Sequence, residues 1–221
     1  MYQEFTQGMK NLMQTFQQNI HTVLPGKIVK FDADKQEAQI TPTAKFWKPD
    51  ASKIDYPDLF EVPVFFIQGI GQEVTITHVV KPGDECMLFF FEQALDQWRT
   101  KAESDTDLRF DISNAVAFVG FFAKPNPHVK RACDNESIII QREKTFIELF
   151  DKKIEIYTDG DIYKEADLTI NIEAGTDINV KAGANITVEA GADISVKAGG
   201  DITIEAGGDI TLKASNIHLN P

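Results

Sequence analysis

The residues that could carry out chemistry are few and lie far apart in this chain. Its four histidines are His21, His78, His128 and His218, and they fall in unrelated segments. No Gly-x-Ser-x-Gly motif, phosphate-binding loop or metal-spaced cluster accompanies them. Acidic residues are numerous, yet none lies in a recognisable acid/base pair. The sequence therefore predicts that the protein is not an enzyme and has no catalytic or cofactor-binding residues.

Repeated acidic side chains and two thiols complete the chemical inventory. An aspartate recurs every eight residues late in the chain, whereas calcium-binding repeats have a period of nine and paired glycines, so we expect strand capping rather than ion binding. The thiols Cys86 and Cys133 form no CxxC motif, and we expect both to be free in a reducing cytoplasm, Cys86 in a strand and Cys133 in a loop. The acidic column consists of Asp177, Asp193, Asp201 and Asp209, with Asn185 in the same place.

The acidic column belongs to a repeat of eight residues that fills the last third of the chain. From Lys153 the octads read KIEIYTDG, DIYKEADL, TINIEAGT, DINVKAGA, NITVEAGA, DISVKAGG, DITIEAGG and DITLKAS, before NIHLNP. Apolar residues at the second, fourth and sixth places give the alternation of a strand with one apolar face. Glycine recurs at the seventh place, where the missing Cβ permits a corner. Strand and corner in regular succession predict a β-helix.

The charge at the fifth place of the octads restricts how they can stack. A turn of two octads would place like charges together, at a cost of roughly 0.2 to 1 kcal/mol per pair. In a triangular cross-section, each octad lies on the third octad after it in one chain, or on the next octad of a neighbouring chain when three chains intertwine. Both arrangements place Glu next to Lys. Because the apolar stripe of one chain is thin, we favour a homotrimer. If each octad advances about 4.8 Å, the rod is on the order of 40 Å long, near the thickness of a bilayer. The fifth places are Glu173, Lys181, Glu189, Lys197, Glu205 and Lys213.

Composition limits the partners and the compartment. The net charge of -12 over 221 residues argues against a nucleic-acid partner, because affinity for phosphates rests on Lys and Arg. The chain has no apolar run of about 18 residues that would make a membrane span, and its start lacks a secretory signal. All sixteen Phe lie at or before Phe150, so the chain has two unlike parts.

The part before the octads reads as one helix followed by strands. Residues 1–24 place apolar side chains at gaps of three and four, which predicts an amphipathic helix stopped by Leu24-Pro25-Gly26. That helix either packs on its own domain or serves as a peripheral anchor or a three-helix contact about the trimer axis. The runs that follow, with turn signals between them, predict a small antiparallel barrel. The predicted strands are 27–32, 37–46, 62–67, 73–80, 83–92 and 115–123, with a turn at 33–36 and a short helix or turn at 93–100.

Aromatic residues in the barrel could serve as stacking platforms for sugars or single strands. Phe89, Phe90 and Phe91 form a continuous apolar run, so we expect them in the buried barrel core. For Trp98 we expect a packed cap of the barrel rather than a binding platform.

The succession of motifs in this part resembles a known family. The runs PGKIVKFDADKQEAQITP, VPVFF, KPGDECMLFFFEQALDQWRT and RFDISNAVAFVGFFAKPNP resemble the N-terminal domain of central baseplate spikes from contractile-tailed bacteriophages. The resemblance covers residues 25–127 by motif order and 153–215 by repeat type. It implies an all-β protein with four parts: an N-terminal amphipathic helix (1–24), an OB-type barrel (25–127), a connector (128–152), and an intertwined trimeric β-helix needle (153–221).

The resemblance also implies a mechanical role in the virion. The trimer would cap the tail baseplate after assembly in the host cytoplasm, binding hub proteins through its N-terminal helix and barrel. Sheath contraction would drive the needle through the host outer membrane. Two alternatives stay open: a receptor-binding or adhesin-type tail fibre, and a hub connector with a separate tip protein in a tail-derived bacteriocin. A fibre should carry a globular knob after its shaft, whereas six residues follow the last octad here, and a tail hydrolase would need a third domain.

Members of this family often hold one iron ion at the trimer tip through a His-x-His pair near the C-terminus. This chain departs from that pattern, because His218 is its only late histidine and occupies the outward third place. One histidine per chain supplies three nitrogens rather than six, and they could hold an ion only if the last turn inverted. His218 is thus the one candidate metal ligand. We favour a blunt end that receives a separate tip protein, and we expect no cofactor.

Overall fold

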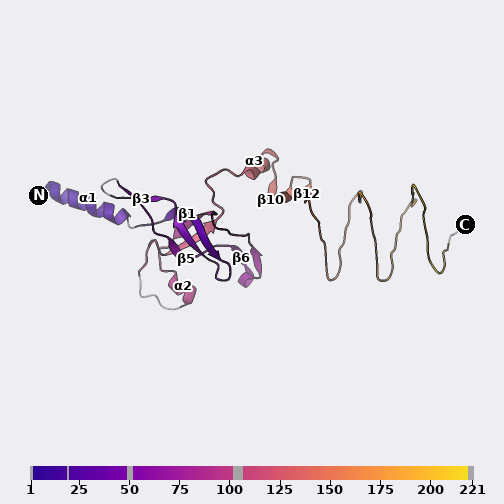
Figure 1. Ribbon diagram of the computed structural model, residues 1–221, viewed down its shortest axis with the longest axis horizontal. Helices are drawn as coiled ribbons and strands as arrows, with labels where there is room; N and C mark the ends of the chain where they lie inside the picture. The colour runs from indigo at the N-terminus through magenta and orange to yellow at the C-terminus, as the bar shows by residue number, and fades with distance from the viewer. Residues whose placement is uncertain (1, 19, 49–51, 102–106, 219–221) are drawn as a thin grey trace. The chain divides into compact units, whose positions relative to one another are not determined.

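The computed structural model describes residues 2–18, 20–48, 52–101 and 107–218. They divide into one unit over Met1–Gly160 and a second over Asp161–Pro221 (Figure 1). In the described residues of the first unit, helices are few and most ordered elements are strands, which agrees with the predicted all-β class. The helices are α1 (Tyr2–Gln18), the 3-10 turn η1 (Ile70–Gln72), α2 (Asp96–Thr100) and α3 (Pro127–Asp134).

The predicted N-terminal helix forms, but it ends at Gln18 rather than at residue 24. Two backbone hydrogen bonds explain the difference. His21 N donates to Phe110 O at 3.0 Å, and Phe90 N donates to Thr22 O at 3.0 Å. These long-range bonds draw the residues after the helix into the sheet, where Leu24-Pro25-Gly26 becomes part of β1 rather than a helix stop.

A five-stranded antiparallel sheet forms the body of the first unit. Its order is β5-β2-β1-β8-β9. The hairpin between β1 and β2 has the predicted turn at residues 33–36, where Asp32 Oδ1 accepts from the backbone N–H groups of Asp34 and Lys35. The strands are β1 (Val23–Asp32), β2 (Glu37–Pro42), β5 (Leu59–Pro63), β8 (Glu85–Phe90) and β9 (Ala115–Val119).

The sheet curls until its two outer strands meet. A parallel bridge joins Val64, just after β5, to Ala117 in β9, and Phe65 N donates to Ala117 O at 2.9 Å. Figure 1 shows the strands of this curled sheet, with β1 and β5 labelled. Alternate side chains point inward and form one apolar core. Its most buried large members are Ile28, Ile40, Leu88 and Cys86.

Short hairpins extend from this sheet. The predicted strand 37–46 is interrupted, so β2 and β3 are separate, and the predicted strand 73–80 is shortened to β7, near its start. In the loop between β8 and β9, Arg99 of α2 forms an ion pair with Glu37 of β2. The hairpin strands are β3 (Lys45–Trp47) with β4 (Lys53–Asp55), and β6 (Ile67–Gly69) with β7 (Val74–Ile76).

After the curled sheet, the chain forms α3 and a three-stranded antiparallel sheet. Asn126 caps α3 by accepting from the His128 backbone N–H at 2.9 Å, and Pro127 occupies the first turn. Cys133 therefore lies in a helix and not in the predicted loop. The sheet has the order β10-β11-β12, and β12 is formed by the first octad. Its strands are β10 (Ile138–Arg142), β11 (Thr145–Leu149) and β12 (Ile154–Tyr157).

Candidate functional surfaces

The second unit repeats its geometry every eight residues, as its sequence does. Bends recur at the seventh and eighth places of successive octads, so the predicted corners are confirmed. Between the bends the trace is extended and swings back and forth (Figure 1). The bends lie at residues 167–168, 175–176, 183–184, 191–192, 199–200 and 207–208.

The octads after the first have no backbone partner within the described residues of their own chain. Over residues 161–218 the structure contains no strand ladder and no backbone–backbone hydrogen bond. The apolar stripe is also uncovered, because second-place side chains such as Ile178 are 57% exposed and fourth-place ones such as Val180 are 69% exposed. Unpaired backbone groups and an open apolar stripe are what a surface for further chains requires. The predicted β-helix is not shown by the described residues 161–218.

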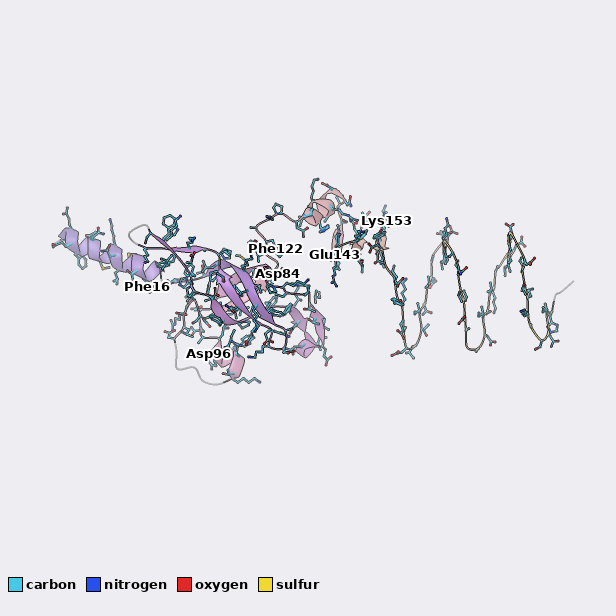
Figure 2. All side chains as sticks on the ribbon, in the orientation of Figure 1. Phe16, Asp84, Asp96, Phe122, Glu143 and Lys153 are labelled. Carbon is cyan, nitrogen blue, oxygen red and sulfur yellow. The ribbon has the colours of Figure 1, made fainter. Side chains whose placement is uncertain are left out.

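The fifth-place charges and the acidic column lie on this open segment. Figure 2 shows side chains on either side of the extended trace of the later octads. Glu189 and Lys197 are exposed, and so is Asp193. The described residues contain no group of three or more His, Cys, Asp or Glu side chains that could hold a metal ion.

His218, the predicted metal candidate, is exposed at the end of the described residues. Within the described part of the chain, it belongs to no group of three or more potential metal ligands. The other three histidines stay apart: His21 lies edge-on to Tyr56 at 5.6 Å, and His78 lies near Phe66 at 5.8 Å, both measured between ring centroids. Burial lowers the pKa of His21, and the nearby Asp111 carboxylate opposes that shift.

A buried carboxylate is the most elaborate polar site of the first unit. The Glu148 side chain on β11 is fully buried and accepts hydrogen bonds from three side chains of the neighbouring α3 region. Asn135 Nδ2 donates at 3.0 Å and Ser137 Oγ donates at 2.7 Å, while Arg131 forms an ion pair with it. The Asn135 hydrogen bond is the largest cause of a lowered Glu148 pKa, and Ser137 and Arg131 add to it against the effect of burial. This clamp fixes α3 to the sheet that leads into the octads.

The aromatic residues of the curled sheet divide between its two faces. Phe90 is 5% exposed and belongs to the core, but Phe89 is 38% and Phe91 is 41% exposed. The prediction that all three are buried is therefore wrong, because neighbouring side chains on an extended chain point to opposite faces. Phe89 instead packs on Phe118, which stacks on Phe65 at 4.6 Å between ring centroids. These three outward rings form an exposed aromatic cluster.

The prediction for Trp98 is also wrong. The side chain is 70% exposed on α2 rather than packed as a cap. Its neighbour Arg99 faces the sheet, where it binds Glu37 and the Glu61 carbonyl. A five-residue helix held by Arg99 leaves the adjacent Trp98 on the solvent side.

The sequence did not reveal the role of Asn114. This side chain is 3% exposed and organises the long loop before β9. Its Nδ2 donates to the carbonyls of Phe91, Gln93 and Leu108 at 3.1, 2.6 and 3.1 Å, and its Oδ1 accepts from Leu95 N at 2.9 Å. The only signal was its place in the RFDISNA motif, which gave no role to the residue.

The N-terminal helix presents an uncovered apolar side. Phe5, Leu12 and Phe16 are between 65% and 68% exposed. Among the helices of the described residues, none combines the length and hydropathy needed to cross a bilayer.

Comparison with known proteins places the curled sheet in phage biology. Residues 24–120, just under half of the chain, match the family described as the phage protein Gp138 N-terminal domain. No curated protein matches the chain. The matched range begins in β1 and ends after β9, so it coincides with the five-stranded sheet. The match supports a phage structural protein, and hence a component of the virion.

Proposed function

We propose that this protein is the central spike of a contractile phage tail baseplate, and that it punctures the host outer membrane when the sheath contracts. The observation that carries the proposal is that the octads of the second unit are unpaired within the described residues of their own chain. These extended octads bend every eight residues and leave both the backbone and the apolar stripe without a partner there. Such a segment is stable only when other chains pair with it.

Three copies satisfy the octads best. Intertwining three chains covers the apolar stripe, pairs the backbone along the rod and alternates the Glu and Lys of the fifth places. A close-packed rod whose hydrogen bonds run along its axis resists bending and local unfolding. The proposed role is therefore mechanical and needs no catalytic residue, no cofactor and no nucleic acid.

The remaining surfaces are assigned to assembly. In this proposal the curled sheet is an OB-type barrel, and its exposed aromatic cluster of Phe65, Phe89 and Phe118 binds the baseplate hub together with α1. Exposed aromatic rings that cluster in this way are typical of protein docking surfaces. At the far end, the lone His218 favours a separate tip protein over an iron ion, because three nitrogens give an incomplete ligand set.

Two measurements test the proposal. Sedimentation of the full chain at micromolar concentration should give about three times the 24.7 kDa of one chain, and a monomer would overturn the trimeric spike. Antibody labelling of intact phage particles should then mark the centre of the tail tip. Label on peripheral fibres would favour the receptor-binding or adhesin alternative, and label on a hub with a second protein at its tip would favour the connector alternative.

A further inference from the structure

One face of the three-stranded sheet before the octads is lined by aliphatic side chains. Strand register aligns six of them in two rows of three. Each side chain is between 37% and 67% exposed, so the face is uncovered in the single chain. We call it the aliphatic face. Its first row is Ile138, Leu149 and Ile154, and its second row is Ile140, Ile147 and Ile156.

The opposite face of the same sheet is already occupied. There Glu148 is held by α3, and Arg131 of α3 lies over the Phe146 ring at 4.4 Å. Phe146 in turn stacks on Tyr157 at 5.4 Å. The helix thus covers the face with the polar clamp and leaves the aliphatic face open, whereas a small sheet needs its apolar face packed to be stable.

The aliphatic face ends where the sequence turns polar. The next row of the register contains Arg142, Thr145 and Thr158, and the two threonine hydroxyls lie 3.0 Å apart. Residues 77–79, which follow β7, line a hollow together with Ile140 and Ile147. The Ile140 side chain is nevertheless 67% exposed. The chain's own barrel therefore does not cover the face.

The identity of the missing partner follows from continuity with the octads. β12 is the first octad, and Ile154 and Ile156 occupy its second and fourth places, as Ile170 and Ile172 do two octads later. Whatever covers the apolar stripe of the octads must also cover this strand. The two rows carry no charge, so an identical face matches them in chemistry.

We infer that the aliphatic face packs against the same face of two further copies of this chain, so that the interface between copies begins at Ile138, before the octads. This inference rests on the trimer of the proposed function. It makes the three sheets an apolar collar with α3 on its outside, and the Glu148 clamp holds β11, which pairs with β12 where the octads begin.

Thiol protection tests the collar in the full-length chain. In a Cys133→Ser background, Ile147→Cys places the test thiol on the central strand, and Lys144→Cys places the control on the exposed β10–β11 turn. The native thiol of Cys86 is fully buried. A maleimide should label Ile147→Cys roughly 100-fold more slowly than Lys144→Cys. Equal rates in a chain that sediments as a trimer would overturn the collar and leave the spike intact.

A pair of charge substitutions provides the second readout. Ile147→Asp would put three carboxylates into the collar. The chain should then sediment as a monomer, or the trimer should dissociate at a temperature on the order of 10 °C lower. Thr145→Asp, on the same strand and face but in the polar row, should leave the trimer unchanged. Protection of Ile147→Cys in a monomeric chain would overturn both the collar and the trimer, because the barrel would then be the cover.

Discussion

The guanidinium of Arg131 on α3 and the carboxylate of Glu148 on β11 form an ion pair in which the carboxylate is fully buried. Asn135 and Ser137 complete its hydrogen bonds, so the buried charge has three donors around it. A buried charge with this many partners holds two elements in one arrangement, and the loss of any partner is costly. The clamp therefore holds α3 against β11, the neighbour of β12, which the first octad forms.

Glu148→Gln should lower the melting temperature of this region by on the order of 5 °C at neutral pH. The amide removes the charge that Arg131 neutralises and introduces donors among groups that already donate. Near-UV circular dichroism follows the transition, because Tyr157 stacks on Phe146 beside the clamp. Glu143→Gln in the exposed turn is the control and should melt like the parent chain.

The clamp also predicts a pH dependence. The hydrogen bond from Asn135, with Ser137 and Arg131, holds the pKa of Glu148 below its ordinary value of 4.5. A lowered folded-state pKa contributes stability that is complete above the unfolded value and is lost as the pH falls through the folded value. At pH values below about 4.5 the melting temperature should therefore decrease as the pH is lowered. The decrease should be steeper in the parent chain than in Glu148→Gln. Parallel curves for the two proteins would show that Glu148 is not the titrating group.

Gly26→Ala should destabilise the curled sheet by about 1 to 3 kcal/mol in chemical denaturation. A Cβ at this position would lie 2.7 Å from Ile40 Cγ2 and 3.2 Å from both Cys86 Sγ and Leu88 Cδ1. All three neighbours belong to the buried core and have little room to move. Gly69→Ala is the matched control, because nothing lies within 4 Å of its added Cβ. Equal stability of the two variants would contradict the close packing around Gly26.

Asn114→Asp should be more destabilising than Asn114→Ala, with losses of about 1 to 3 kcal/mol or more. The aspartate would aim a carboxylate oxygen at three backbone carbonyls that now accept from Nδ2. The loop before β9 would open. Hydrogen exchange of the Leu95 N–H should then become faster, because its hydrogen bond to the side chain of residue 114 would form less often. Asn114→Asp that exchanges like the parent chain would refute the role of this side chain.

The two thiols should react at very different rates. Burial raises the pKa of the Cys86 thiol to about 11, and its side chain is fully covered, whereas Cys133 is exposed on α3. Because the thiolate is the reactive form, an alkylating reagent at pH 8 should add one label per folded chain and two in denaturant. Mass spectrometry counts the labels. Two labels on the folded chain would contradict the packing of β8.

The alternation of local sequence predicted much of the curled sheet. It located the β1–β2 turn and predicted the strand that contains Cys86. It failed where distant backbone decides the outcome: the helix stops early because His21 bonds to Phe110, far along the chain. The same limit hid Asn114, whose partners lie up to 23 residues away, and the Glu148 clamp, whose Arg131 is 17 residues away.

In the octads, the sequence predicted the local corners but not the pairing. Their period predicted the corners at the seventh places, because a corner depends on local residues such as Gly183 and Gly191. The described residues 161–218 show the bends without a strand ladder, and in the proposed trimer the pairing would come from neighbouring chains. The fifth-place charges of Glu189 and Lys197 therefore remain a prediction about the assembly.

Glu189→Lys tests that charge ladder. In the proposed trimer, the new lysine lies beside the fifth-place lysines of adjacent octads, Lys181 and Lys197, and each like-charge contact costs roughly 0.2 to 1 kcal/mol. The trimer should melt several degrees lower at low salt, and the difference should shrink in 1 M salt because screening shortens the reach of surface charges. Glu189→Gln, which removes the attraction without adding repulsion, should lie between the parent chain and Glu189→Lys. A trimer whose melting temperature at low salt is unchanged by both substitutions would rule out the alternating ladder.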